Sequence, residues 1–302
     1  MTRDGLLLVD KATGLTSHDV VDLFRRRTRV KRVGHAGTLD PLATGLLVLC
    51  VGKVTRLQSY LMSFEKTYEG EIQFGWATDS FDAAGAPVGE ETPADVGSVD
   101  FSPLVAKLTG EIEQMPPQFS AKKVGGVRAY ELARRGERAD LKPKRVSVRE
   151  LTILAVEGSV ARFRVRCSAG TYVRSIADEL GKMTGTGAHL KSLRRTAVGP
   201  LTVEEAMPSD SIREAADEDL FRVPHFRGMQ DIPMPLPFVM VDPMQERKLM
   251  SGQTIVTRAE EPLNRGDLVC ITNTGDEIVG LAEAVDVVGE RGVVSLQPRV
   301  VL

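Results

Sequence analysis

The sequence predicts an α+β protein with a small β domain at its C-terminus. Through the first two thirds of its 302 residues, apolar runs of strand length are interspersed with amphipathic helical patterns. Residues 228–237 then contain four prolines or glycines and no helical pattern, which marks a domain boundary. Beyond it, short β-type runs are separated by glycine and aspartate, as in a small barrel or sandwich. We therefore expect domains at residues 1–228 and 229–302, a division that the length allows.

The N-terminal part is predicted to hold three strands and two helices. Apolar or alternating runs of strand length occur at residues 5–10, 46–51 and 67–74. Thr16 and Ser17 supply an N-cap for a helix through Phe24, and a second helix is expected over residues 54–64. Residues 76–100 are rich in Gly, Pro, Ala and Asp, so we expect loops there.

The middle of the chain combines a basic segment with a strand pair and a helix. Residues 116–146 open with two prolines, carry many basic residues and are expected to include a short helix. Residues 146–156 and 160–167 are predicted to pair as strands around a turn at Gly158. A helix should begin near Thr171, because four apolar residues then recur at helical spacing: Val173, Ile176, Ala177 and Leu180.

The charge of the chain is segregated, although the net charge is only −2. Residues 22–32 carry six basic and one acidic residue, and residues 120–150 carry ten basic and four acidic residues, so their net charges are +5 and +6. Residues 79–113 compensate with eight acidic residues and one basic residue. Such a surface can attract phosphates at one face while the molecule stays near neutral. Two solvated basic faces would explain the charge alone equally well.

The composition argues against several functional classes. No apolar stretch approaches the roughly 20 residues that a membrane-spanning helix needs. The N-terminus carries no visible secretory signal, so we expect a cytoplasmic protein. Cys50, Cys167 and Cys270 are odd in number and far apart, which predicts neither a disulfide framework nor a zinc site. The sequence has no metal-binding cluster and no dinucleotide-binding fingerprint, so no cofactor is expected.

Asp40 lies between a glycine-rich turn and Pro41, and its local pattern allows two interpretations. An aspartate followed by proline and apolar residues is typical of a helix start, with the aspartate as N-cap, and local pattern alone favours this role. Gly34 and Gly37 favour a functional interpretation, because glycine lets the backbone approach a ligand closely. His35 adds a ring that can stack or hydrogen-bond beside the carboxylate.

Arg174 and Tyr68 also have a structural and a functional interpretation. A cation in the first turn of a helix opposes the helix dipole, so Arg174 is either a solvent-exposed side chain or one held there to pair with a carboxylate such as Asp40. Such a pair would keep the aspartate ionised. Tyr68 is either ordinary strand filler, which its position alone favours, or a platform for an unstacked base with a hydroxyl for proton transfer.

Five segments, in their order along the chain, are similar to segments of the bacterial tRNA pseudouridine synthase B family. The longest reads GHAGTLDPLATG and contains Asp40. The five segments are residues 9–17, 34–45, 66–68, 167–175 and 187–196. Together they extend the resemblance over most of the predicted first domain. Ala12 stands where many relatives have proline, which concerns only a turn.

The resemblance implies a pseudouridine-synthase fold: a central mixed, mainly antiparallel sheet flanked by helices, with a small C-terminal RNA-binding barrel of the PUA type. It implies an isomerase that converts uridine 55 in the T-loop of tRNA to pseudouridine by base flipping, without a cofactor. Asp40 matches the catalytic nucleophile, Arg174 its ionic partner and Tyr68 the aromatic residue that stacks on the target base. Residues 116–146 match an insertion that closes over the T-arm. Three further residues match positions that contact the substrate: His35, Tyr172 and Leu193.

Two other functions stay open on the sequence. A guide-RNA-dependent synthase of the dyskerin type shares the Asp40 segment, but it relies on partner proteins and lacks an insertion like residues 116–146. A catalytically silent RNA-binding protein or RNA-folding chaperone would bind tRNA equally well, yet every matched catalytic position is intact. We therefore expect a stand-alone, monomeric enzyme that acts on the T-arm of tRNA and needs no protein partner. An RNA-folding role alongside catalysis stays open.

Overall fold

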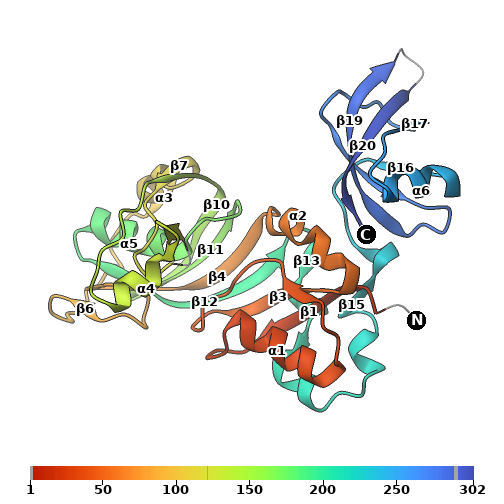
Figure 1. The fold of residues 1–302 in the computed structure, drawn as a ribbon. Coiled ribbons are helices and arrows are strands. Elements are labelled where there is room, and N and C mark those ends of the chain that lie inside the picture. Colours follow the sequence, from red (N-terminus) through yellow and green to blue (C-terminus); the bar gives the residue numbers. More distant parts are fainter. Residues whose placement is uncertain (1–2, 121, 289–291) are drawn as a thin grey trace.

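The computed structural model describes residues 3–120, 122–288 and 292–302. Figure 1 shows a large sheet with its helices and, beside them, a smaller curled sheet that contains the C-terminus. The large sheet has eleven strands. They are β1 (Gly5–Lys11), β2 (Val33–His35), β3 (Thr44–Val51), β4 (Lys66–Phe74), β7 (Gly110–Gln114), β10 (Lys144–Glu157), β11 (Val160–Cys167), β12 (Ala188–Val198), β13 (Leu201–Thr202), β14 (Met207–Pro208) and β15 (Phe226–Gly228).

This sheet is mixed and mainly antiparallel, as predicted. Its longest path runs β14-β1-β3-β12-β4-β11-β10-β7, with β15 beside β1, β2 beside β3 and β13 beside β12. The β1–β14 and β3–β12 pairs are parallel, and the other pairs are antiparallel. The predicted pairing of β10 with β11 is therefore confirmed.

Six α-helices and five short 3-10 helices accompany the two sheets within the described residues. The α-helices are α1 (Ser17–Thr28), α2 (Gln58–Met62), α3 (Ser102–Lys107), α4 (Ala129–Arg134), α5 (Val173–Thr184) and α6 (Pro243–Met250). The 3-10 helices are η1 (Gly52–Leu57), η2 (Val203–Glu205), η3 (Ser209–Arg213), η4 (Asp219–Phe221) and η5 (Met229–Asp231). The helix expected over residues 54–64 is instead η1 followed by the short α2, because β-branched Val54 and Thr55 disfavour a regular helical turn.

Local capping explains why α1 begins where the sequence predicts. Thr16 Oγ1 accepts a hydrogen bond from the Asp19 N–H at 3.1 Å, and Asp19 Oδ2 accepts one from the Thr16 N–H at 2.8 Å. This reciprocal pair satisfies two backbone donors at the helix start. Val20 and Phe24 then bury one face of α1 against β1 and β3.

The two faces of the large sheet are covered differently. α1 packs on one face beside β1 and β3, and α5 packs on the same face beside β4, β11 and β12. Tyr68 on β4 and Leu193 on β12 contact both of these cores, so they lie where the two meet. η1, α2 and part of the C-terminal sheet cover the opposite face over β1 and β3. The gap between α1 and α5 is therefore filled partly by loops, which can carry a site.

A weak seam divides the large sheet beside these loops. β3 and β12 pair only at Thr44 with Arg194 and at Gly45 with Arg195. Gly45 has φ +95°, and a Cβ there would lie 2.3 Å from the Arg195 carbonyl oxygen, so only glycine allows this close approach. The loop that precedes β3, residues 36–43, is thereby brought next to β12.

Two regions differ from the sequence prediction. β12 was not predicted as a strand, because shifts of register at Leu190/Ser192 and Arg195/Ala197 break the alternation of apolar and polar residues. Residues 76–100 are mostly irregular, as predicted, but include the two-residue strands β5 (Ala77–Thr78) and β6 (Pro87–Val88).

The basic segment forms a small unit at the end of the large sheet. It contains the hairpin β8 (Lys123–Val124) and β9 (Val127–Arg128), followed by α4. Ala129, Ala139 and Leu141 form the buried part of its own small core. Residues 144–146, which we had included in the segment, belong to β10 and pair with β7.

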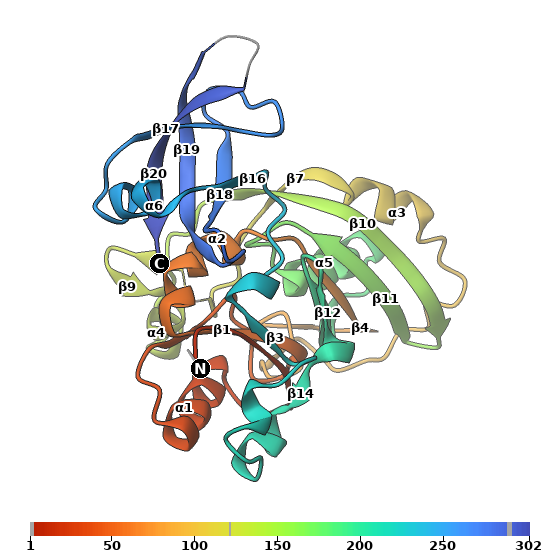
Figure 2. The ribbon, with the colours of Figure 1, turned by 90° about the vertical axis from the view of Figure 1, so that its right-hand side faces the viewer.

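The C-terminal sheet is small and curled, as predicted (Figure 2). Its order is β16-β18-β19-β20-β17, and the β-type runs of the sequence at residues 253–256, 268–271 and 293–296 correspond to β17, β18 and β20. The strands are β16 (Phe238–Met240), β17 (Ile255–Arg258), β18 (Leu268–Thr272), β19 (Ile278–Val288) and β20 (Val293–Val301). Cys270 and Leu281 of this sheet join the core formed with Leu57, and Arg56 Nη1 donates to the Val301 carbonyl at 2.6 Å. None of the helices in the described part of the chain has the length and apolar character needed to cross a membrane.

Candidate active site

Asp40 lies in a tight turn between β2 and β3, so the interpretation of Asp40 as a helix cap is wrong. The Ala43 N–H donates to the Asp40 carbonyl at 3.0 Å, and β3 begins at the next residue. The turn is fastened on both sides of the aspartate. Ser17 Oγ accepts from the Leu39 N–H at 2.8 Å, and Lys11 Nζ lies 3.5 Å from the Pro41 carbonyl.

Arg174 joins Asp40 to a second carboxylate, Asp82. Arg174 Nε lies 3.1 Å from Asp40 Oδ2, and Arg174 Nη1 lies 3.2 Å from Asp82 Oδ2. The side chains of Arg174 and Asp82 are each 7% exposed, whereas that of Asp40 is 45% exposed. The remaining donors of the guanidinium bind the carbonyls of Ser80 at 2.9 Å and Phe119 at 3.1 Å. One end of this network is therefore buried and fixed, and the Asp40 end reaches the surface.

Asp82 was not singled out in the sequence, because it lies in the segment expected to form loops. Its Oδ1 accepts hydrogen bonds from Ser80 Oγ at 2.6 Å and from the Ala84 N–H at 3.1 Å, while Oδ2 faces Arg174. A buried carboxylate with both oxygens occupied is held in one orientation. Asp82 can therefore fix the guanidinium that contacts Asp40.

The start of α5 is held from outside the helix. The Tyr172 N–H donates to Gln114 Oε1 at 2.7 Å, and Gln114 Nε2 donates back to the Tyr172 carbonyl at 3.0 Å. Arg174 is the second residue of α5, where its charge opposes the helix dipole. Asp40 and Asp82 supply the negative charge that this position favours, which accounts for the arginine there.

Tyr68 lies on β4 between Val165 of β11 and Arg195 of β12. It and Leu193 pack against the core that contains Leu39, the residue before Asp40. Burial raises the pKa of the Tyr68 hydroxyl, and the charge of Arg195 opposes that rise. Tyr68 is therefore a neutral hydroxyl at pH 7 that lies close to the Asp40 turn.

His35 lies at the end of β2, opposite Leu49 of β3. Burial lowers the pKa of its ring, with the charges of Arg195 and His18 adding to the effect. Its Nδ1 is buried and has no hydrogen-bond partner within the described residues. The structure pairs Asp40 directly with Arg174; in the same part of the chain no hydrogen bond or ion pair joins His35 or Tyr172 to Asp40.

Three cations that the sequence did not single out are buried near this site. Lys11 is 0%, Arg195 1% and Lys66 6% exposed. Burial lowers the pKa of Lys11 to about 8, against the opposing effect of Asp40, and burial followed by the charge of Arg195 lowers the pKa of Lys66 to about 8. Periodicity could not find these residues, because a charged side chain normally indicates an exposed position.

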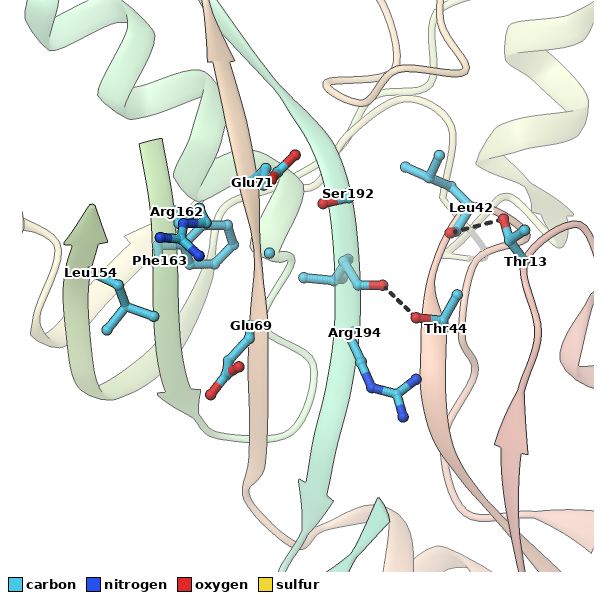
Figure 3. A pocket seen from close by; sticks show the side chains of 12 residues that line it. Thr13, Leu42, Thr44, Glu69, Glu71, Leu154, Arg162, Phe163, Ser192 and Arg194 are labelled. Carbon is cyan, nitrogen blue, oxygen red and sulfur yellow. Dashed lines mark hydrogen bonds between the residues drawn. The ribbon is translucent and has the colours of Figure 1, made fainter. Parts of the chain in front are cut away.

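A groove of about 470 Å³ lies on the other face of the sheet (Figure 3). Glu69 and Glu71 line it, and they alternate along β4 with Tyr68, so they point away from the Asp40 side. Arg194, also in its lining, forms two hydrogen bonds to Asp10 at 2.9 and 2.7 Å. Leu42 of the Asp40 turn and Leu193 also line the groove, so it adjoins the site around Asp40 from the other face of the sheet.

The described residues offer neither a metal site nor an activated thiol. No group of three or more His, Cys, Asp and Glu side chains gathers there in a way that could hold a metal ion. Cys50, Cys167 and Cys270 are buried, and burial raises their pKa values to about 12, 11 and 12.

Residues 25–173 match the family model "TruB family pseudouridylate synthase (N terminal domain)", and residues 174–223 match "tRNA pseudouridylate synthase B C-terminal domain". The chain is 41% identical to tRNA pseudouridine synthase B of Solibacter usitatus, over 93% of this chain and 96% of the relative. It is 50% identical to tRNA pseudouridine synthase B of Thermobifida fusca, over 69% of this chain and 74% of the relative.

Solved structures show the same fold. One chain of an archaeal box H/ACA sRNP Nop10-Cbf5 complex superposes with a TM-score of 0.72 at 23% identity, covering 99% of this chain and 86% of that chain. One chain of a Cbf5-Nop10-Gar1 complex gives a TM-score of 0.72 at 26% identity, over 99% and 85% of the two chains. The fold, the ordered motifs and the matches to both family models lead to one conclusion: this chain belongs to the TruB family of pseudouridylate synthases.

Proposed function

We propose that this chain converts uridine 55 in the T-loop of tRNA to pseudouridine, with Asp40 as the nucleophile. The relatives that it matches are named tRNA pseudouridine synthase B, which supports pseudouridine formation in tRNA as the reaction. The observation that carries the choice of residue is the ion pair between Asp40 and the buried Arg174, at 3.1 Å. A carboxylate that is paired through one oxygen and still 45% exposed is held in place and can reach a substrate.

The reaction conserves the atoms of the base. The N1–C1′ bond breaks, the detached base turns, and C5 forms a new bond to C1′. C5 then loses its hydrogen to solvent and N1 gains a proton, so nothing is oxidised or hydrolysed and no redox cofactor is needed. Asp40 can contribute by adding to C6 of the base, by trapping C1′, or by removing a proton from C2′. Arg174 would hold that carboxylate in place through the ion pair at 3.1 Å.

Tyr68 is proposed to stack on the target base and to take part in removing the proton from C5. Its hydroxyl is neutral at pH 7, so it would need Asp40 or a water molecule to accept that proton onward. Leu193, next to it on the same core, would pack against the base. Together these two side chains would form the apolar surface that contacts the base beside Asp40.

A uridine stacked in a folded loop does not present its reacting atoms to an enzyme side chain, so we propose that the base is flipped out to reach Asp40. Unstacking costs a few kcal/mol, and contacts made by the enzyme would offset it. His35 is suited to fill the space that the base leaves, because its ring is neutral and Nδ1 lacks a partner within the described residues. Tyr172, at the start of α5, would contact the RNA beside Arg174.

The basic segment and the C-terminal sheet are proposed to hold the RNA. Residues 120–138 carry six basic and two acidic residues, a net charge of +4, which suits contact with the phosphates of the T-arm. We place the division between catalytic and RNA-binding parts at residues 228 and 229, between β15 and β16. The enzyme is proposed to act alone, as a cytoplasmic monomer without guide RNA or protein partner, because the basic segment gives it an RNA contact of its own.

The purified chain, with no other protein or guide RNA, should release tritium from a T-arm stem-loop whose target uridine is labelled at C5. A matched stem-loop with labelled uridine only elsewhere should release none. Release that appears only after other proteins or a guide RNA are added would refute the stand-alone proposal. Tight binding of both RNAs with no release from either would instead identify an RNA-binding or RNA-folding protein.

A further inference from the structure

Arg195 is a buried guanidinium that ties β12 to the loop carrying Asp40. Its side chain is among the largest that are fully buried in the described part of the chain, with 1% exposure. Nε donates to the Leu46 carbonyl at 2.6 Å, Nη2 to the Gly37 carbonyl at 3.0 Å and Nη1 to the Thr38 carbonyl at 3.3 Å. These three acceptors lie on both sides of Asp40 along the chain.

The position of Arg195 in β12 also relates it to the proposed base-binding residues. In the pairing of β12 with β4 it lies directly opposite Tyr68, and it is two residues beyond Leu193. In the pairing of β12 with β3 it lies opposite Gly45. The Arg195 side chain therefore connects β4 and β12, which would hold the base, with the loop that carries Asp40. It does so where β3 and β12 share only two paired positions.

Stability alone does not account for a cation at this place. The acceptors found for Arg195 in the described residues are three carbonyl oxygens and the Tyr68 hydroxyl, none of which carries a full negative charge, and burying a charge without a counter-charge is costly. Lys11 and Lys66, whose pKa values burial lowers, lie close enough to add to that cost. The neighbouring Arg194 shows the ordinary alternative, since it is exposed and forms a pair with Asp10.

We propose that Arg195 is a positioning residue for the isomerisation: its three hydrogen bonds fix the spacing between the Asp40 carboxylate and a base held on Tyr68 and Leu193. This inference rests on the proposed function. It differs from the role of Arg174, which contacts the carboxylate itself. Arg195 hydrogen-bonds the backbone on both sides of Asp40 and the Tyr68 hydroxyl, so its removal should change where Asp40 lies relative to the base and leave RNA capture intact. Misplacement of a reacting group by about 1 Å can lower a rate by about 100-fold.

The test compares Arg195→Met and Arg195→Lys with the control Arg194→Met. Arg194 is the adjacent residue on the other face of β12 and is not part of the proposed site. Turnover of the T-arm stem-loop is measured by tritium release, RNA affinity by titration, and the folded fraction by thermal unfolding. We expect Arg195→Met to lower kcat by about 100-fold while KM and RNA affinity stay within about threefold. Arg195→Lys should recover part of kcat, because lysine can still donate to one or two of the carbonyls.

Each outcome decides the proposal. A folded Arg195→Met with the kcat of the wild type overturns it. So does a loss of kcat and RNA affinity in the same proportion, matching the loss of folded protein, because that describes a purely structural residue. If Arg195→Met does not fold, Arg195→Lys decides alone: lowered kcat in a folded protein supports the proposal, and unchanged kcat overturns it. A wild type that releases no tritium refutes the proposed function instead.

Discussion

Replacing Asp82 with asparagine removes the negative charge at the buried end of the Arg174 network and leaves its shape almost unchanged. At 3.2 Å, two unit charges attract by about 5 kcal/mol in a medium of effective dielectric constant 20. Removing one partner of a buried pair usually costs 3–5 kcal/mol. We expect a loss of about 3 kcal/mol in the free energy of unfolding, because Arg174 keeps Asp40 and two carbonyls as partners.

Such a loss should lower Tm by roughly 5–10 °C. The freed guanidinium would shift relative to Asp40, so kcat for tritium release should fall by about 100-fold at a temperature where the protein is folded. RNA affinity should change little, because Asp82 is buried. Asp79→Asn is the matched control: Asp79 is exposed in the same segment, and its Oδ1 accepts from the Ala86 N–H at 2.9 Å, a bond that asparagine can keep. Wild-type kcat in a folded Asp82→Asn would refute the reasoning that Asp82 orients Arg174.

Two further predictions concern a buried lysine and the basic segment. Burial lowers the pKa of Lys66 to about 8 from 10.5, so between these pH values the unfolded chain holds more protons and the free energy of unfolding rises with pH, by at most roughly 3 kcal/mol. In denaturant titrations from pH 7 to pH 10.5, the free energy of unfolding of Lys66→Met should rise less steeply than that of the wild type, with the share due to Lys11 retained, whereas the exposed Lys53→Met should follow the wild type; parallel curves for Lys66→Met and wild type would contradict the assignment. Replacing residues 120–138 with a short Gly-Ser linker removes a net charge of +4, so the salt dependence of RNA binding should become shallower by up to about 3 in log–log slope, with Tm nearly unchanged. Equal loss of RNA affinity and stability would argue against a closing role for that segment.

Much of the fold was predictable because its signals are local. The N-cap of α1 depends on Thr16 and Asp19, three residues apart, and the β10–β11 hairpin on a turn at Gly158. The apolar face of α5 follows from helical spacing within a single segment. Such features depend on residues that are close together in the sequence, so they can be recognised from the sequence alone.

The features that were missed depend on residues far apart in the sequence. β12 carries the charged Arg195 at a buried position, and its register shifts hide the alternation that identifies a strand. Asp82 and Arg174 are 92 positions apart in the sequence, and they pair only because α5 packs against the loop that carries Asp82. Arg195 is buried because carbonyls about 150 residues earlier accept its hydrogen bonds, which no periodicity can reveal.

The candidate site also has one part that the sequence predicted and one part that it did not. The resemblance named Asp40 and Arg174, and the structure pairs them at 3.1 Å. The local pattern around Asp40 suggested a helix cap, because Pro41 is compatible with a first helical turn, but Pro41 occupies a tight turn that leads into β3. The pairing of β3 with β1 and β2 outweighed the local preference of this segment for a helix start.

The most direct test of the central claim is the rate of tritium release by Asp40→Asn compared with wild type, on a T-arm stem-loop labelled at C5 of the target uridine. Asparagine keeps the shape of the side chain but cannot act as an anionic nucleophile or base. We expect release to fall by about 10⁴-fold or more, while the variant still binds the stem-loop with nearly the wild-type dissociation constant. Release by folded Asp40→Asn at a rate near that of the wild type would contradict the claim that the Asp40 carboxylate carries the reaction.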